Sequence, residues 1–176
     1  DAITFEEREA PAYDEAAVQR AQKLAQKKPF SGCPGMRAKQ FQRSTAPAAG
    51  AACPSQLSQW PVQIKLAGVM APCFDDADLL IAADCTAYAY GNFHEKFIRG
   101  RITLIGCPKL DAVDYAEKLT AIFAAHSIRS VTVARMEVPC CGGIEQAVQR
   151  AIAASGKDIS CHVTVIGTDG TIQEER

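Results

Sequence analysis

Four cysteines in this chain stand where metal-binding chemistry can be assembled. Cys85 ends the run IAADC, Cys107 ends TLIGC, and Cys140 and Cys141 follow RMEVP. The apolar run before each of them is typical of a buried strand. If these strands are parallel, their carboxyl ends lie along one edge of a sheet, where open α/β sheets bind ligands. The sequence therefore predicts that thiols 22 and then 33 positions apart converge on one crevice.

The residues that follow these cysteines favour negative charge at the same edge. Thr86, Pro108 and Gly142 each open a predicted helix, and the amides of a helix N-terminus stabilise anions. Four thiolates gathered there could hold a tetrahedral zinc ion or an iron–sulfur cluster. Zinc sites commonly use paired C-x₂₋₄-C knuckles, and the chain has none. This spacing favours a cluster, of the 4Fe-4S type or of a larger or irregular type.

The adjacent pair Cys140-Cys141 complicates the ligand set, because neighbouring side chains often diverge. Either Cys33, in the turn-like segment SGCPGM, replaces one of them or the site is larger than a cubane. The predicted ligands are therefore Cys33, Cys85, Cys107, Cys140 and Cys141. The other cysteines are expected to pack as small apolar residues, since free cysteine is among the most buried residue types: Cys53, Cys73 and Cys161.

A few other polar side chains are weaker candidates near this edge. His94 could act as a proton donor or ligand, and its alternative is a surface position on a helix. Lys109 could stabilise a negative cluster or be a solvated lysine at a helix start. Asp84 and Glu137 could move protons, although carboxylates are common at strand ends. Four further side chains are interpreted as structural: His126 and His162 at the ends of elements, and the packing tyrosines Tyr88 and Tyr90.

From residue 61 onward the pattern alternates between strands and helices, as in a parallel sheet covered on both faces. Helices are predicted over 86–98, over 111–125 with Asp111 as N-cap, and over 143–154 with Gly156 as the stop. The predicted fold is three-layer α/β/α with a mostly parallel sheet of the Rossmann or flavodoxin-like kind. Its predicted strands are 62–69, 78–83, 101–106, 130–138 and 162–167.

Residues 1–60 read differently from the rest of the chain. Residues 13–28, YDEAAVQRAQKLAQKK, predict a helix that Pro29 stops. The segment 31–60 is rich in Gly, Pro, Ser, Ala and Gln and predicts an extended arm. The start DAITFEEREA shows no signal peptide, which favours reduced thiols and a cytoplasmic location. Because the chain begins at Asp1 without methionine, we interpret it as a piece whose upstream sequence is missing.

Composition and absent motifs exclude several classes of function. The 19 basic and 20 acidic residues balance, so the chain has no excess of positive charge that would favour binding to nucleic acid or to an anionic membrane. No apolar run approaches the roughly 20 residues that a membrane span requires. The sequence also lacks three common motifs. It contains no G-x-G-x-x-G motif for a dinucleotide, no P-loop for a nucleoside triphosphate and no G-x-S-x-G motif for a hydrolase nucleophile.

Four segments carry a resemblance to a known family: SQLSQWPVQIKL, ADLLIAADCTAYAYGNFHEKF, LIGCPKLD and MEVPCCGG. Together they resemble the C-terminal region of ferredoxin-like proteins of anaerobic bacteria and archaea that are described as 4Fe-4S binding-domain proteins. The resemblance covers nearly the whole chain. It implies that the family's motif cysteines fall on Cys33, Cys85, Cys107, Cys140 and Cys141. It also implies an upstream ferredoxin module with two four-cysteine motifs, to which residues 1–60 would be the linker, although this chain has no C-x₂-C-x₂-C run.

The expected function is therefore that of a cluster-binding domain, residues 61–176, in electron transfer. Its partner would be the ferredoxin module or another electron-transfer protein, and the domain would serve as a component of an oxidoreductase. Two other interpretations stay open. One is a zinc-stabilised or metal-free α/β module that docks a partner through the crevice. The other is a redox protein that uses Cys140 and Cys141 as a vicinal dithiol.

Overall fold

A computed structural model of the protein describes residues 53–176. The predicted helix over 13–28, most of the predicted arm and Cys33 lie outside the described residues. Nothing about their roles follows from the structure. Within the described part, no helix is long and apolar enough to cross a membrane.

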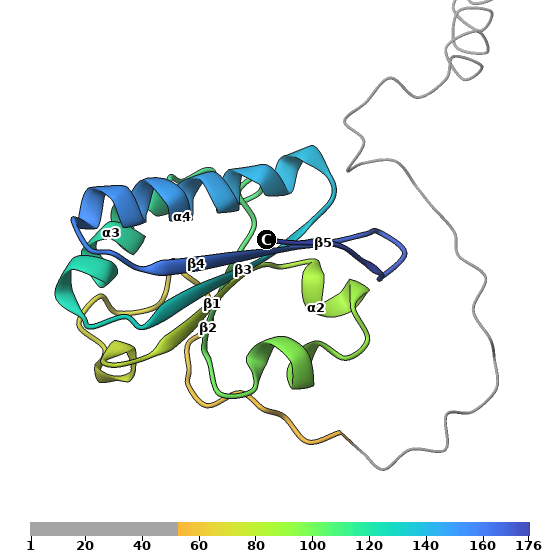
Figure 1. Cartoon of the computed structure of the whole chain (residues 1–176), viewed down its shortest axis with the longest axis horizontal. Helices are drawn as coiled ribbons and strands as arrows, with labels where there is room; N and C mark the ends of the chain where they lie inside the picture. The colour runs from red at the N-terminus through yellow and green to blue at the C-terminus, as the bar shows by residue number, and fades with distance from the viewer. Residues whose placement is uncertain (1–52) are drawn as a thin grey trace, which may run out of the picture. The chain divides into compact units, whose positions relative to one another are not determined.

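The core element is a five-stranded sheet with the spatial order β2-β1-β3-β4-β5 (Figure 1). Neighbouring strands among the first four pair in parallel, and β5 runs antiparallel to β4. The predicted α/β fold with a mostly parallel sheet is confirmed. The strands are β1 Asp78–Ala83, β2 Ile102–Gly106, β3 Ser130–Met136, β4 Ser160–Ile166 and β5 Ile172–Glu175.

Helices cover both faces of the sheet, so the predicted three layers are also confirmed. On one face lie α3, Tyr115–Ala125, and α4, Gly142–Ser155; on the other lie the short α2, Thr86–Ala89, and the π-helical turn η3, His94–Ile98 (Figure 1). Alternate residues of β1 point to the two faces, as a strand's period of two requires. Leu79 and Ile81 join the core under α3 and α4, whereas Leu80 and Ala82 join the core that contains Phe93 and Phe97.

The prediction of a first strand over 62–69 is wrong. Only Gln63 forms a bridge, alongside Ile105 at the outer edge of β2. The backbone then turns, because the amides of Leu66 and Ala67 both donate to the Gln63 carbonyl, at 2.9 and 3.0 Å. Ile64 and Ala67 are buried three residues apart, a spacing that fits a turn rather than an alternating strand.

The sequence also gave no indication of β5, and it overextended one helix. The residues of β5, IQEE, are mostly exposed and acidic, so they carry no apolar alternation; the hairpin turns at Gly170, with φ 89°. The predicted helix 86–98 is split, since α2 ends at Ala89 and Tyr90 is extended. Rings from the two parts then pack together, with Tyr90 and Phe97 centroids 5.4 Å apart.

The other two helices lie close to where the sequence placed them. The N-cap of α3 is Asp114 rather than Asp111, because the Asp114 carboxylate accepts from the Ala116 amide at 2.9 Å. Helix α4 begins at Gly142 and ends before Gly156, which adopts the left-handed φ of 69° that favours glycine. The predicted stop at Gly156 is confirmed.

The order of the strands creates a switch point between β1 and β3. From β1 the chain continues through α2 and η3 to β2 on one side, and from β3 it continues through α4 to β4 on the other. The two connections also cover opposite faces of the sheet (Figure 1). In open α/β sheets the crevice beyond the carboxyl ends of two such strands is the usual ligand site.

Candidate functional site

The predicted cysteines of the described chain lie at this carboxyl edge. Cys85 follows β1 by two residues, Cys107 directly follows β2, and Cys140 and Cys141 follow β3 within a 3-10 turn, Pro139–Cys141. The ends of β1 and β2 are level, because Ala83 pairs with Gly106 and the Asp84 amide donates to the Gly106 carbonyl at 3.2 Å. The parallel register thus brings three separate segments to one edge.

The thiols at this edge influence one another electrostatically. Burial raises the pKa of the Cys85 thiol, and negative charge at Cys107, Asp84 and Cys140 raises it further. Burial raises the pKa of Cys141 to about 12 against the lowering effect of a backbone hydrogen bond at Met136, and charge at Cys140 and Cys85 raises it further. Cys85 is exposed, Cys107 and Cys140 are half-buried, and Cys141 is only 5% exposed. These four thiols therefore share one environment that opens to solvent at Cys85.

Cys140 and Cys141 differ in burial, since Cys140 is half-buried and Cys141 is buried, and charge at Cys140 helps to raise the pKa of Cys141. The turn that carries them is closed by the Cys141 amide, which donates to the Val138 carbonyl at 3.0 Å. Gly143 then packs against the loop after β2, since a Cβ placed there would lie 3.1 Å from Pro108 Cβ. This close approach joins the Cys107 loop to the turn of Cys140 and Cys141.

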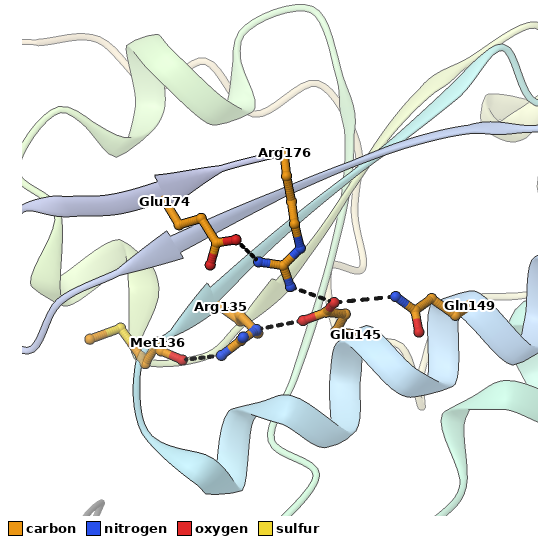
Figure 2. A network of polar contacts seen from close by, with 6 residues as sticks. All are labelled: Arg135, Met136, Glu145, Gln149, Glu174 and Arg176. Atoms are coloured by element: carbon orange, nitrogen blue, oxygen red, sulfur yellow. Dashed lines mark hydrogen bonds and ion pairs between the residues drawn. The ribbon is translucent and has the colours of Figure 1, made fainter.

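A partly buried ion network fixes the start of α4 against β3 (Figure 2). Arg135 on β3 donates through Nε to Glu145 Oε2 at 2.7 Å, and Arg176 donates to Glu145 Oε1 at 2.7 Å. Burial by itself would raise the pKa of Glu145, but the hydrogen bonds from Arg176 and Arg135 outweigh it and lower that pKa. Because Glu145 lies in the first turn of α4, this network holds the adjoining cysteine turn in place.

A second polar group, which the sequence pattern only partly indicated, lies beside Cys85 and Cys107. Within the described chain, Asp84 Oδ1 is buried and has no hydrogen-bond partner. Burial raises the pKa of Asp84, and the neighbouring Asp111 carboxylate raises it further. The Tyr115 hydroxyl donates to Asp111 Oδ2, and burial followed by this bond raises the pKa of Tyr115 above its usual range. The available signal was that Asp84 and Asp111 both follow strand ends, as the cysteines do.

The remaining candidates are engaged elsewhere or exposed. His94 is exposed, and its Nδ1 accepts from the Gln56 amide at 3.1 Å. Glu137 accepts from the amide and the hydroxyl of Thr168, at 3.0 and 2.8 Å, and so supports the loop before β5. His126 is not an ordinary end residue, because it is 5% exposed and both of its ring nitrogens have partners. Lys109 is exposed at the start of the loop after β2.

The described side chains set limits on what this edge can bind. Within residues 53–176, no three His, Cys, Asp or Glu side chains form a group that could hold a single metal ion. A tetrahedral zinc ion, with Zn–S distances of about 2.3 Å, requires thiolates roughly 3.8 Å apart. A cubane binds each cysteine through a separate iron and so accepts a wider arrangement. A zinc ion and a cluster thus place different demands on the spacing of the same thiols.

Comparison with known proteins agrees with this fold. An uncharacterized protein of Archaeoglobus fulgidus is 28% identical over 118 residues, which cover 67% of this chain and 84% of that protein. No solved structure matches the chain. The family described as the Rossmann-like domain matches residues 71–176, more than half of the chain, including β1 to β5 and the cysteine edge. By this match, the protein belongs to the Rossmann-like domain family.

Proposed function

We propose that this domain binds an iron–sulfur cluster at the carboxyl edge of its sheet and exchanges single electrons with another redox protein. Cys85, Cys107 and Cys140 are the proposed ligands, and Cys141 or Cys33 completes the set. The observation that carries the proposal is the convergence of thiols from three strand ends at the switch point. Charge at Cys107 and Cys140 raises the pKa of Cys85, and charge at Cys140 and Cys85 raises the pKa of Cys141.

The backbone around the edge supports an anionic group. Helix α4 starts directly after Cys141, and no side chain caps its first amides. Although the Gly142 amide donates to the Pro139 carbonyl, the positive end of the dipole of this 14-residue helix stabilises nearby negative charge. A cluster with four thiolate ligands is negatively charged, and so are the thiolates that must form before it binds. The helix thus offsets part of the cost of deprotonating Cys140 and Cys141.

The burial of the thiols divides their roles. When bound, an iron–sulfur cluster supplies one-electron transfer. Cys85 is exposed and gives the shortest route from the edge to a docked partner, because electron transfer requires close approach. Cys141 is buried in the core that contains Phe93 and Phe97 and restricts water on the inner side.

The resemblance to ferredoxin-like 4Fe-4S proteins supports the same ligands and supplies the partner. Under this proposal, the partner is the upstream ferredoxin module or another small electron-transfer protein. The domain would then be an oxidoreductase component rather than a complete enzyme. The cysteines that the resemblance leaves out, Cys53, Cys73 and Cys161, also lie away from the carboxyl edge or outside the strands.

Anaerobic purification and reconstitution with iron and sulfide test the proposal. We expect a brown protein with iron and acid-labile sulfide in equal amounts and an EPR signal after reduction. Zinc at one equivalent without sulfide would instead support the zinc-stabilised module. The vicinal dithiol would instead be supported by a colourless, metal-free protein. In that protein, mild oxidation would remove two free thiols by joining Cys140 and Cys141 in a disulfide, and reduction would restore them.

A further inference from the structure

A groove on the opposite half of the molecule is independent of the cysteine edge. It lies on the sheet face that carries η3, toward the amino ends of the strands, and has two adjoining cavities of about 390 and 350 Å³. Both cavities are lined by Arg101, Thr132 and His162, so they form one continuous groove. Cavities of about 300 Å³ or more are large enough for a small metabolite.

The floor of the groove is polar where a covered sheet would be apolar. Thr132 on β3 and Thr164 on β4 are only 8% and 5% exposed. Their hydroxyls have no hydrogen-bond partner within the described residues, yet they are not fully enclosed. Further along the same face, β3 and β4 carry the apolar core residues Met136 and Ile166. The two hydroxyls are therefore available to a ligand on the floor.

One wall of the groove holds a fixed cation. Arg101 Nη1 donates to the carbonyls of Lys96 and Phe97, at 3.1 and 3.0 Å, which holds the guanidinium against η3. Among the described residues no carboxylate forms an ion pair with Arg101. It acts on Asp78 only through space, and the Asp78 carboxylate is already engaged by Arg129 and Ser130.

The other charges in the groove are largely neutralised. Lys96 pairs with Glu175 at 2.8 Å, and Arg99 pairs with Glu95. The guanidinium of Arg176 turns away to Glu145 and Glu174 (Figure 2). His162 contacts Ser160 Oγ through Nε2 at 3.2 Å and leaves its Nδ1 without a partner in this part of the chain. The groove thus offers one unpaired guanidinium, an imidazole and two hydroxyls.

We propose that this groove binds the phosphoryl group of a small molecule. A guanidinium binds two phosphate oxygens at once, and hydroxyl donors serve the remaining oxygens. Arg101 supplies the fork, and Thr132 and Thr164 supply the hydroxyls. Inorganic phosphate and a phosphomonoester would both present such oxygens to these residues. The groove has room for the organic part of an ester beside Phe97 and Val163.

Calorimetric titration of the full chain with inorganic phosphate and, separately, with glycerol 3-phosphate tests the proposal. We expect saturable binding in at least one titration. Tighter binding of inorganic phosphate would identify the free ion as the ligand, and tighter binding of glycerol 3-phosphate would identify a phosphomonoester. Arg101→Gln should weaken it about tenfold or more, because it removes a charged hydrogen-bond donor. Arg150→Gln is the matched control, since it removes the same charge from a residue that pairs with Asp114 outside the groove.

A second variant protects the test against a folding defect. Arg101→Gln also removes two bonds to the backbone of η3, whereas Thr132→Val removes one hydroxyl and leaves those bonds intact. We expect Thr132→Val to weaken binding several-fold with an unchanged melting temperature. The proposal is overturned if neither compound binds saturably up to about 20 mM, far weaker than the affinities typical of metabolite sites. Equal weakening by Arg101→Gln and Arg150→Gln would also overturn it.

Discussion

Asp78 and His126 at the amino edge of the sheet differ in their pairing from Asp84 at the carboxyl edge. Asp78 accepts from Arg129 and Ser130, and the buried His126 lies between Asp75 Oδ1 at 2.7 Å and the Val69 carbonyl at 2.8 Å. At the carboxyl edge Asp84 Oδ1 is buried without a partner in the described chain, and the thiols there form no disulfide.

The difference is clearest in two aspartates that flank the same strand. Hydrogen bonds from Arg129 and Ser130 lower the pKa of Asp78, the first residue of β1. Burial and the Asp111 carboxylate raise the pKa of Asp84, the residue after β1. Perturbed and unpaired groups collect at functional sites, whereas paired groups serve stability. The pairing of Asp78 and His126 therefore stabilises the fold at the amino edge, whereas Asp84 Oδ1 at the carboxyl edge has no such partner among the described residues.

The largest expected effect separates two cysteines at opposite edges. Cys85→Ala should reduce iron and sulfide after anaerobic reconstitution to background, because Cys85 is a proposed ligand. Since Cys85 is exposed, the free energy of unfolding of the apoprotein should change by no more than about 0.5 kcal/mol. Iron analysis and urea unfolding measure the two quantities.

Cys161→Ala is the matched control for that experiment. Cys161 is the second residue of β4 and packs against the core under α4, away from the carboxyl edge. Its variant should keep the full iron content and lose some stability, because a half-buried side chain is truncated. Equal loss of iron in both variants would remove the distinction between the edges.

His126→Ala, at the amino edge, should have the opposite effect to Cys85→Ala: it should reduce stability and keep the iron content. The change leaves the Val69 carbonyl without its partner and removes a buried ring that packs edge-on against Phe74, with centroids 5.6 Å apart. We expect it to lower the free energy of unfolding by about 2–3 kcal/mol and to leave the iron content per folded chain unchanged. His162→Ala, an exposed histidine, should cost about 0.5 kcal/mol or less. Loss of iron in His126→Ala would contradict a purely structural role.

The sequence predicted the carboxyl edge better than the amino edge, for a physical reason. The apolar run 78–83 was predicted to the residue, and the edge position of the cysteines follows once the strands are parallel. Local patterns carry that information. The role of His126 depends on partners 51 and 57 positions away, and no local pattern encodes them. Likewise, β5 joins the sheet through backbone pairing with β4, and its mostly exposed side chains show no apolar alternation from which a strand could be predicted.

Gly106→Ala tests the packing beneath the cysteine edge. A Cβ at this position would lie 2.7 Å from Tyr115 Cζ, so the ring and its bond to Asp111 would have to shift. We expect a loss of about 1–2 kcal/mol in unfolding free energy and a lower cluster occupancy, since Cys107 is the next residue. Gly91→Ala is the control, because a Cβ there meets nothing within 4 Å. Similar unfolding curves for both variants would show that the close approach of Tyr115 is not needed.

The smallest effect concerns Asp78 and appears only as a dependence on pH. The pKa of Asp78 is lowered in the folded protein, so its ionised form contributes stability above its ordinary value of 3.8. That contribution is lost as the pH falls through the lowered folded value. Because the side chain is 34% exposed, solvent screening limits the effect to less than about 1 kcal/mol.

Urea unfolding of the wild type and Asp78→Asn between about pH 2 and pH 7 measures this contribution. The two curves should differ most near neutral pH and converge in acid, where the wild-type carboxylate is protonated as well. Added salt should narrow the difference at neutral pH, since the pair with Arg129 is partly exposed. Asp158→Asn, at an exposed site without an ion pair in the described chain, should follow the wild type throughout. A difference that stays constant at every pH would assign Asp78 a packing role, because the loss of an ionised partner of Arg129 makes the difference between the two proteins depend on pH.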